Sequence, residues 1–448
     1  MRQEHTSGSA PASASRHNRR IVITGANVFK NGAFSRMDVS IQGKSIAGAG
    51  RDLPRYDNDI IIKSDGLFLV PGFADVHVHL REPGFSYKET IATGSRAAAR
   101  GGYTLICAMP NLNPPPDSVE NLEVQLRLIE KNAAVRVIPY GCITLGREGR
   151  EITDMRAMAK YVVGFSDDGS GVQDPLVMKR AMIEAKAAGV PIAAHCEDES
   201  LLRGGYIHDG WYALKHGHAG ICPESEYAQI SRDIALVRET GCRYHVCHVS
   251  AKESVELIRA AKAEGLPVTC ETAPHYLALC EDDLIDDGRF KMNPPLRTFA
   301  DRQALIDGIK DGAIDAVATD HAPHSAAEKS KGLKESLMGV VGLETAFAAL
   351  YTRLVGTGAL ALEDLIELMS VKPRRIFGLG GGIIEEGADA DITLVDIEHE
   401  YEIRPEEFIS MGRSTPFEGM RVRGRAALTM VGGKIVYIDD KTGPGIRV

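Results

Sequence analysis

The chain has 448 residues, of which 44% are hydrophobic and 25% charged, and its formal net charge is −9. This composition is typical of a globular protein, and the length suffices for a barrel of roughly 250–300 residues plus a smaller unit. The negative charge argues against nucleic acid as a partner, and the lack of a long apolar run argues against a membrane span.

The N-terminal region divides into two parts by composition. Residues 1–20 are rich in Ser, Ala and Arg and lack a hydrophobic stretch, which predicts a disordered extension rather than a secretory signal. Residues 21–69 contain short β-rich runs separated by Gly-containing turns, such as residues 21–24 (IVIT) and 38–41 (DVSI). These runs predict a small antiparallel unit.

Residues 70–382 alternate strand-like apolar runs with segments rich in Ala, Glu and Lys. Such alternation is typical of repeated βα units. We expect eight strands, at residues 75–80, 103–109, 135–143, 162–166, 192–195, 244–249, 268–272 and 314–319. We expect helices between most of them, for example at residues 87–100, 176–188 and 251–263. Eight such units predict a closed parallel (β/α)8 barrel.

Residues 383–448 return to β-type sequence, with runs at 390–395 and 428–436. We expect this segment and residues 21–69 to form one small β-sandwich domain, which the barrel interrupts in the sequence. The predicted fold class is therefore α/β, a (β/α)8 barrel with a β-sandwich built from both terminal segments.

Two histidines stand out in the first barrel strand, where residues 75–81 read DVHVHLR. Because side chains alternate along a strand, His77 and His79 face the same side. Paired imidazoles are good ligands for zinc, although an isolated pair more often makes structural hydrogen bonds. Further polar residues follow later strands, namely Asp167, Asp168, His195, His248 and Asp320.

These polar residues fall at the C-terminal ends of strands one, four, five, six and eight. A barrel carries its active site at that face. Buried ionisable groups are costly unless they are paired or bind a metal. A metal centre accounts for all of them together.

The same residues carry a resemblance to the amidohydrolase superfamily and, within it, to class I dihydroorotases. The matching segments are 75–84 (DVHVHLREPG), 108–111 (AMPN), 165–169 (FSDDG), 194–198 (AHCED), 247–250 (CHVS), 293–297 (NPPLR) and 318–324 (ATDHAPH). The resemblance runs from about residue 21 to the C-terminus. It implies an enzyme of pyrimidine biosynthesis that interconverts N-carbamoyl-L-aspartate and (S)-dihydroorotate plus water.

The resemblance also implies a centre of two zinc ions. His77, His79 and Asp320 would hold one ion and His195 and His248 the other, with Asp168 shared. Many relatives use a carboxylated lysine at the end of strand four, but no lysine stands there in this chain. One branch uses an aspartate whose spacing to the next histidine ligand matches Asp168, and Asp167 is the alternative. Asp320 is expected to shuttle a proton as general acid and base.

Substrate selection is expected to depend on residues near the metal ligands. A guanidinium at Arg81 suits bidentate capture of a carboxylate, although an arginine after a strand is usually an ordinary surface residue. Asn111 and His324 could bind substrate or belong to loops, and the resemblance adds Met338 and Gly339. The loop 325–342 could exclude water. The expected substrate contacts are His79, Arg81, Asn111, Asn293, His324, Met338 and Gly339.

Two other functions stay open. The first is another cyclic-amide hydrolase, such as an allantoinase, hydantoinase or dihydropyrimidinase, against which Arg81 and the missing lysine both argue. The second is a non-catalytic subunit that scaffolds aspartate transcarbamoylase, against which the full ligand set argues. The partners expected are a small-molecule substrate, a second copy in a homodimer and an aspartate transcarbamoylase. Eight cysteines without CxxC spacing predict free thiols in the reducing cytoplasm.

Overall fold

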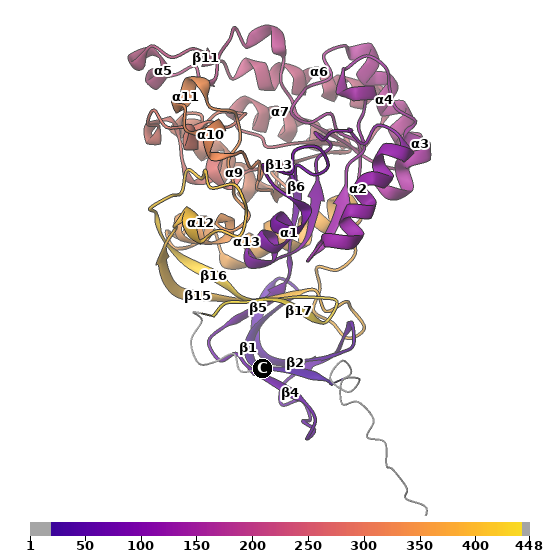
Figure 1. Ribbon diagram of the computed structural model, residues 1–448, viewed down its shortest axis with the longest axis vertical. Helices are drawn as coiled ribbons and strands as arrows, with labels where there is room; N and C mark the ends of the chain where they lie inside the picture. Colours follow the sequence, from indigo (N-terminus) through magenta and orange to yellow (C-terminus); the bar gives the residue numbers. More distant parts are fainter. Residues whose placement is uncertain (1–18, 441–448) are drawn as a thin grey trace, which may run out of the picture.

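A computed structural model describes residues 19–440 of the chain (Figure 1). The predicted disorder of residues 1–20 therefore falls almost entirely outside the described residues, as do residues 441–448 of the C-terminal segment. In Figure 1 a twisted β-sheet lies at one end of the molecule, and a larger layer of helices and short strands lies above it.

Strands from both terminal segments form one eight-stranded sheet, ordered β17-β16-β15-β5-β1-β2-β3 with β4 paired to β1. The N-terminal strands are β1 (Ile21–Lys30), β2 (Ala33–Gln42), β3 (Ser45–Gly50), β4 (Ile60–Lys63) and β5 (Phe68–Pro71). The C-terminal strands are β15 (Ile392–Glu402), β16 (Arg421–Val431) and β17 (Lys434–Ile438). The two segments meet where β5 pairs with β15, with Val70 opposite Thr393.

The prediction of a purely antiparallel N-terminal unit is wrong in part. β2 pairs antiparallel with β1 and with β3, but β4 and β5 both pair parallel to β1. The chain leaves β3 through residues 51–59 and returns along the direction of β1, so a hairpin pattern cannot continue. The sheet is mixed, and its buried face is lined by aliphatic residues such as Ile23, Leu69 and Leu394.

The barrel strands are parallel and form one closed ring. They are β6 (Phe73–Val78), β7 (Tyr103–Ala108), β8 (Arg136–Pro139), β9 (Ile192–Ala194), β12 (Tyr244–Val246), β13 (Val268–Thr272) and β14 (Ala316–Val317). One sheet runs β6-β7-β8 and another runs β14-β13-β12-β9. Single β-bridges join the two sheets into a ring. Phe165 pairs with Gly141 and Ile192 on one side, and Val78 pairs with His321 on the other.

The prediction of a strand at 162–166 is wrong, but this segment does occupy the place of the fourth strand in the ring. Only Phe165 pairs there, with Gly141 on one neighbour and Ile192 on the other. The chain passes tightly at this point, since a Cβ on Gly164 would lie 2.9 Å from the Pro191 carbonyl oxygen. A single bridge on each side is too short for a ladder, yet it completes the barrel.

Helices surround these strands, and several agree closely with expectation. Helix α4 begins at Pro175 and α7 at Lys252, each within one residue of the predicted start. Helix α1 begins at Ile91 because Thr90 caps it: the Thr90 hydroxyl accepts from the Thr93 amide at 3.1 Å. The helices are α1 (Ile91–Arg100), α2 (Val119–Asn132), α3 (Met155–Met158), α4 (Pro175–Ala188), α5 (Trp211–His216), α6 (Glu224–Thr240), α7 (Lys252–Ala263), α8 (Pro274–Ala278), α9 (Phe299–Asp311), α10 (Ala326–Lys329), α11 (Gly332–Glu335), α12 (Ala346–Leu350), α13 (Leu362–Ile366) and α14 (Lys372–Phe377). Two-residue strands β10 (Ile207–His208) and β11 (Gly220–Ile221) pair outside the ring.

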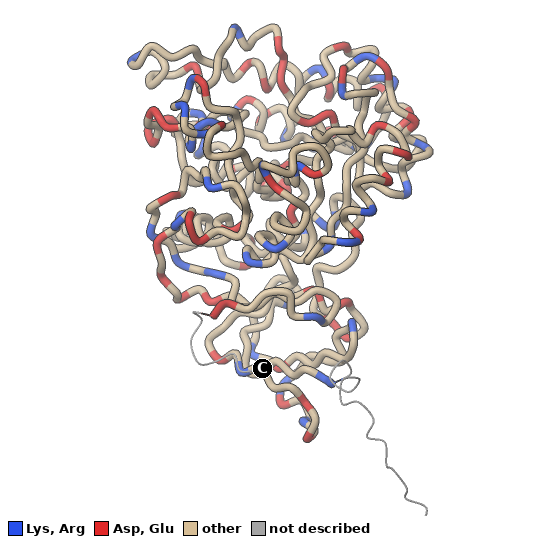
Figure 2. Tube along the Cα trace, in the orientation of Figure 1, with Lys and Arg blue, Asp and Glu red and all other residues tan. Residues whose placement is uncertain are grey.

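Charges of both signs are interspersed along the traced chain, and neither sign dominates either layer (Figure 2). Ion pairs connect neighbouring elements. For example, Arg238 Nε on α6 lies 2.7 Å from Oε2 of Glu264, just after α7. Such exposed pairs contribute little to stability, because solvent screens them, so the fold depends mainly on the buried apolar contacts. No helix within residues 19–440 is both long and apolar enough to cross a membrane.

Candidate active site

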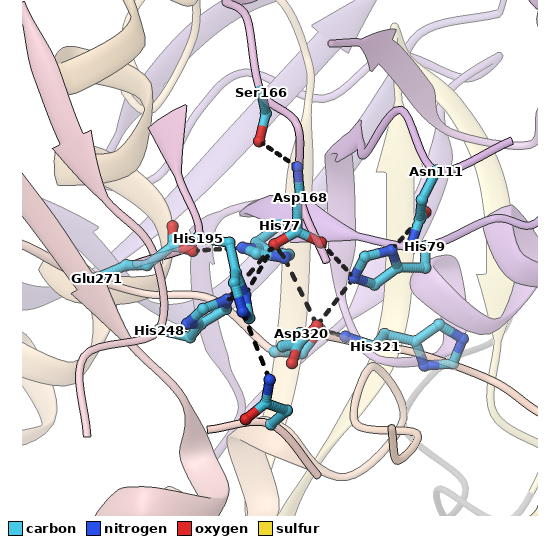
Figure 3. Close-up of polar contacts among 12 residues, drawn as sticks. His77, His79, Asn111, Ser166, Asp168, His195, His248, Glu271, Asp320 and His321 are labelled. Carbon is cyan, nitrogen blue, oxygen red and sulfur yellow. Dashed lines mark hydrogen bonds and ion pairs between the residues drawn. The ribbon is translucent and has the colours of Figure 1, made fainter. Parts of the chain in front are cut away.

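The six metal ligands expected from the sequence converge at the C-terminal mouth of the barrel (Figure 3). All six are buried, the most accessible of them being only 6% exposed. They come from five points of the ring, with His77 in β6 and His79 directly after it, because parallel strands bring their carboxyl ends to one edge. The six are His77, His79, Asp168, His195, His248 and Asp320.

Asp168 occupies the middle of this cluster. Its Oδ1 lies 3.3 Å from His79 Nε2, and its Oδ2 lies 3.4 Å from the Nε2 atoms of both His77 and His248. His195 presents Nδ1 instead, 3.6 Å from Asp168 Oδ2 and 3.0 Å from His248 Nε2. The carboxylate therefore faces both pairs of imidazoles, which is the arrangement a shared ligand needs.

Asp320 completes the cluster from the far side of the ring. Its Oδ1 lies 3.0 Å from His79 Nε2 and 3.5 Å from His77 Nε2. Although burial opposes ionisation, the hydrogen bond with His79 and the charges of neighbouring histidines hold the pKa of Asp320 well below its usual range. Both carboxylates are thus anionic groups placed among imidazole nitrogens.

The chemistry of this donor set fits a metal centre. Four imidazoles and two carboxylates are ligand types that zinc accepts. The Nε2 atom of His77 is buried and has no hydrogen-bond partner among the described residues, as expected for a nitrogen whose lone pair serves a cation. Two groups, His77/His79/Asp168 and Asp168/His195/His248, each bring their ligand atoms within 4.8 Å of one another.

Hydrogen bonds to Nδ1 orient the rings of two histidines. His77 directs Nδ1 to Glu271 Oε1 at 2.9 Å, and His79 directs Nδ1 to Asn111 Oδ1 at 2.8 Å. Each acceptor keeps the proton on Nδ1 and leaves Nε2 to face the cluster. Asn111, expected to bind substrate, thus already uses its carbonyl oxygen on His79.

Asp167 is turned away from the cluster. Its Oδ1 accepts from the backbone amides of Ile143 and Thr144 at 2.8 and 3.1 Å, and its Oδ2 accepts from the Thr144 hydroxyl. These bonds fasten the loop after β8 to the loop that carries Asp168. Of the two neighbouring aspartates, only Asp168 faces the histidines.

Three residues at this mouth have a left-handed backbone, although none is a glycine. The φ angles are 60° at Arg81, 36° at His248 and 47° at Asp320. Such conformations cost of order 1–3 kcal/mol each and persist where the surrounding structure enforces them. Hydrogen bonds of neighbouring residues hold these segments in place: the His79 amide donates to the His321 carbonyl at 2.8 Å, and the Val249 amide, next to His248, donates to the Glu271 carbonyl at 2.8 Å.

A pocket of about 210 Å³ opens onto the cluster. Every expected substrate contact lines it: His79, Arg81, Asn111, Asn293, His324, Met338 and Gly339. Asn293 donates from Nδ2 to Glu197 Oε1 at 2.9 Å, while its Oδ1 is buried and finds no hydrogen-bond partner within residues 19–440. That oxygen is free to accept from an N–H of a bound molecule.

The Arg81 guanidinium is only 8% exposed, so it is not an ordinary surface arginine. Its Nε donates to the Pro323 carbonyl at 3.2 Å, which aims the terminal nitrogens along the pocket wall toward His324. Both ring nitrogens of His324 are engaged within the protein, Nε2 with the Met338 carbonyl at 2.8 Å and Nδ1 with Lys88 Nζ at 3.1 Å.

Sequence reasoning missed three supporting side chains: Glu271, Glu197 and Lys88. Glu271 is the contribution of strand seven, the one late barrel strand for which no site residue was expected. A charged residue inside the apolar run VTCET was a usable signal, because a buried carboxylate needs a partner. Hydrogen bonds from His245 and His77 outweigh burial and lower the pKa of Glu271 to about 2.

Comparisons with known proteins agree with this site. A family model described as dihydro-orotase-like matches residues 66–254. A dihydroorotase from Fusobacterium nucleatum is 48% identical over 423 residues, covering 94% of this chain and 99% of that protein. A dihydroorotase from Staphylococcus aureus is 46% identical over 422 residues, covering 94% and 100%.

Solved structures place the fold among cyclic-amide hydrolases. An L-hydantoinase (dihydropyrimidinase) from Arthrobacter aurescens superposes with a TM-score of 0.85 at 26% identity, covering 96% of this chain and 97% of that one. A dihydropyrimidinase from Brevibacillus agri gives a TM-score of 0.82 at 24% identity, covering 95% and 96%, and supports the fold alone. Because relatives nearly half identical match over almost their full length, the chain belongs to the dihydroorotase family of the amidohydrolase superfamily.

Proposed function

We propose that this chain is a dihydroorotase, which reversibly cyclises N-carbamoyl-L-aspartate to (S)-dihydroorotate plus water in pyrimidine biosynthesis. The observation that carries this proposal is the buried Arg81 guanidinium in the same pocket as the carboxylate–imidazole cluster. Dihydroorotate offers a ring carboxylate to the arginine and a cyclic amide to the cluster. Allantoin, hydantoin and dihydropyrimidines have the amide but lack the carboxylate.

The residues that would hold two zinc ions are His77, His79 and Asp320 for one, and His195 and His248 for the other. Asp168 would be shared, as its central position suggests. When bound, such ions lower the pKa of a water between them and polarise the substrate carbonyl.

Asp320 is the residue we assign to proton transfer. Its carboxylate lines the pocket beside the expected metal ligands, so it is placed to take a proton from the attacking water. It would then deliver that proton to the amide nitrogen that leaves the ring carbon. In the direction of ring closure the same carboxylate takes the proton from the ureido nitrogen and returns it to the departing water.

The remaining pocket residues would orient the ring. Arg81 binds the carboxylate with its forked N–H groups, and the free Oδ1 of Asn293 accepts a ring N–H. Asn111 keeps its amide N–H groups for substrate while its oxygen orients His79. Met338 and Gly339 close one wall of the pocket beside His324.

We also propose the division of the chain expected from its sequence: a barrel domain at 70–382 and one β-sandwich domain built from 21–69 and 383–448. The pairing of β5 with β15 supports the joining of the two segments. A homodimer, an association with aspartate transcarbamoylase and a place in the cytoplasm stay predictions of the family resemblance.

A second candidate, a hydantoinase-type activity, is favoured by the L-hydantoinase likeness. One assay decides between the two. Purified protein of known metal content is offered dihydroorotate, hydantoin, allantoin and dihydrouracil in parallel. Turnover confined to dihydroorotate supports the proposal, and faster turnover of an uncharged ring would refute it.

A further inference from the structure

Lys88 lies in the loop between β6 and α1 and is not one of the expected metal ligands or substrate contacts. Its side chain is only 11% exposed, although lysine side chains are normally solvated. Nζ lies 3.1 Å from Nδ1 of His324 and 3.0 Å from Oε1 of Glu328. Lys88 is therefore held behind His324, which lines the pocket, rather than extended into solvent.

The contacts of His324 determine where its proton lies. Its Nε2 is 2.8 Å from the Met338 carbonyl oxygen, which can only accept, so Nε2 must carry the hydrogen. Nδ1 is then the acceptor, and the Lys88 ammonium is its donor. Lys88 therefore selects the neutral Nε2–H form of the ring.

This choice affects Arg81. The Nη2 atom of Arg81 lies 3.5 Å from His324 Nε2, but two N–H donors cannot bond each other. Nη2 therefore keeps its protons for another acceptor, while the Nε2 proton of His324 stays on the Met338 carbonyl oxygen. The guanidinium thus keeps its forked donors for the two oxygens of a carboxylate.

Lys88 is itself fixed by the opposite loop. Glu328 accepts from the Ser325 amide and hydroxyl, both at 2.9 Å, and from the Tyr87 hydroxyl at 3.2 Å. The ion pair with Lys88 thus links the loop after β6, which carries Arg81, to the loop after β14, which carries His324. Arg81 and His324 keep their spacing because this ion pair connects the two loops.

We propose that Lys88 is a positioning residue for the substrate carboxylate. It holds the His324 ring in its Nε2–H form, so that the ring takes no proton from Arg81 and the guanidinium keeps its donors for the carboxylate. This inference rests on the proposed function, because it takes the bound molecule to be a cyclic amide with a carboxylate.

The test measures binding of orotate, a planar carboxylate analogue of dihydroorotate, to the metal-loaded enzyme by titration calorimetry. Lys88→Met should weaken binding about 10- to 100-fold, the size expected for one charge-assisted contact. Lys88→Arg should keep most of the affinity, since the charge and a donor remain. Lys334→Met removes an exposed lysine of α11, in the segment after β14 that also carries His324, and should bind as the wild type does.

A double-mutant cycle shows whether Lys88 acts through the ring. In a His324→Ala background, adding Lys88→Met should cost little more, because the group that Lys88 positions is already gone. Metal content and thermal unfolding are measured for every variant, and Lys88→Gln replaces the Met variant if the latter does not fold. Unchanged orotate affinity, or an equal loss in both backgrounds, would overturn the inference.

Failure of the proposed function looks different. Wild-type enzyme that binds orotate but does not turn over dihydroorotate contradicts the proposed activity and leaves the Lys88 result standing. Wild-type enzyme that turns over dihydroorotate, together with an unaffected Lys88→Met variant, contradicts only the role of Lys88.

Discussion

The eight-stranded sheet and the mouth of the barrel bury their side chains in different ways. The core of the sheet is aliphatic, with Val39, Ile392 and Leu428 among residues wholly removed from solvent. The mouth of the barrel buries imidazoles and carboxylates instead, among them His77 and Asp168. The sheet gains stability from apolar burial, whereas the mouth carries desolvated charge that a folded protein tolerates only when it is compensated.

Backbone strain follows the same division. In the sheet region, non-glycine residues with positive φ lie in exposed turns, at Asn31 and Asp52. Arg147 and Arg203 in loops of the barrel also have positive φ and are not buried, but Arg81, His248 and Asp320 at the mouth are buried site residues. The sheet stabilises the fold, whereas the mouth of the barrel is held in a less stable arrangement that the reaction needs. Substitutions in the sheet should therefore lower mainly stability, and substitutions at the mouth should lower mainly activity.

The largest effect is expected at Asp168. Asp168→Ala removes the carboxylate that faces all four imidazoles, so bound metal should fall and turnover should become undetectable. Asp167→Ala is the matched control, because it should loosen the loop at Thr144 and reduce turnover less. Metal analysis and kinetics on both variants make the comparison, and the reverse ranking would move the shared ligand to Asp167.

Arg81→Lys should have the next largest effect on activity. Lysine keeps the charge but cannot reproduce the fork of the guanidinium. Losing a buried charge-assisted contact costs roughly 2–5 kcal/mol, so kcat/KM for dihydroorotate should fall about 30- to 5000-fold. Metal content should stay near normal because Arg81 is not among the expected ligands. Equal kinetics at matched metal content would remove the main support for a carboxylate substrate.

Glu271→Gln should weaken metal retention more than it disturbs the fold. The carboxylate accepts from His77 Nδ1 and His245 Nε2, and losing such a partner typically costs about 10- to 100-fold in metal affinity. Asp233→Asn serves as control, since Asp233 is equally buried but bonds Tyr244 away from the cluster. Competition with a chelator measures the affinity. Identical metal retention in both variants would mean that Glu271 is structural only.

The smallest effect on activity is expected in the sheet. Leu394→Ala removes a fully buried side chain from β15 and should lower the free energy of unfolding by about 2–5 kcal/mol. At a temperature where the variant remains folded, kcat/KM should match the wild type. Denaturant unfolding and kinetics measure the two effects separately. A variant that is stable but inactive would show that the two regions are not separable.

Many of the strands and most of the site residues could be predicted from the sequence, because the periodicity of apolar residues and the spacing of motifs are local signals. The strand at Val268–Thr272 matches its prediction residue for residue, and the histidines after strands one, five and six converge as expected. The segment around Phe165 was mistaken for a strand because pairing depends on neighbours that the sequence does not reveal.

Partners that come from distant strands were harder to foresee. Glu271 meets His77 across 194 residues of sequence, and no spacing rule connects them. The proton position on His324 depends on Lys88 and on the Met338 carbonyl together, so it becomes visible only in three dimensions. The parallel pairing of β4 with β1 could not be predicted either, because nothing in the sequence of the segment before β4 indicates the direction in which that strand runs.

The pairing of β5 with β15 has a consequence for how the enzyme is made. β5 ends at Pro71, six residues before His77, yet its partner strand begins at Ile392. A ribosome adding about 5–20 residues per second needs on the order of tens of seconds to cover that interval. During this time β5 presents an unpaired edge to the solvent, which is a hazard for association between nascent chains. Completion of the sheet is therefore a late event in synthesis, and we expect chains interrupted before β15 to aggregate rather than to wait as a folded barrel.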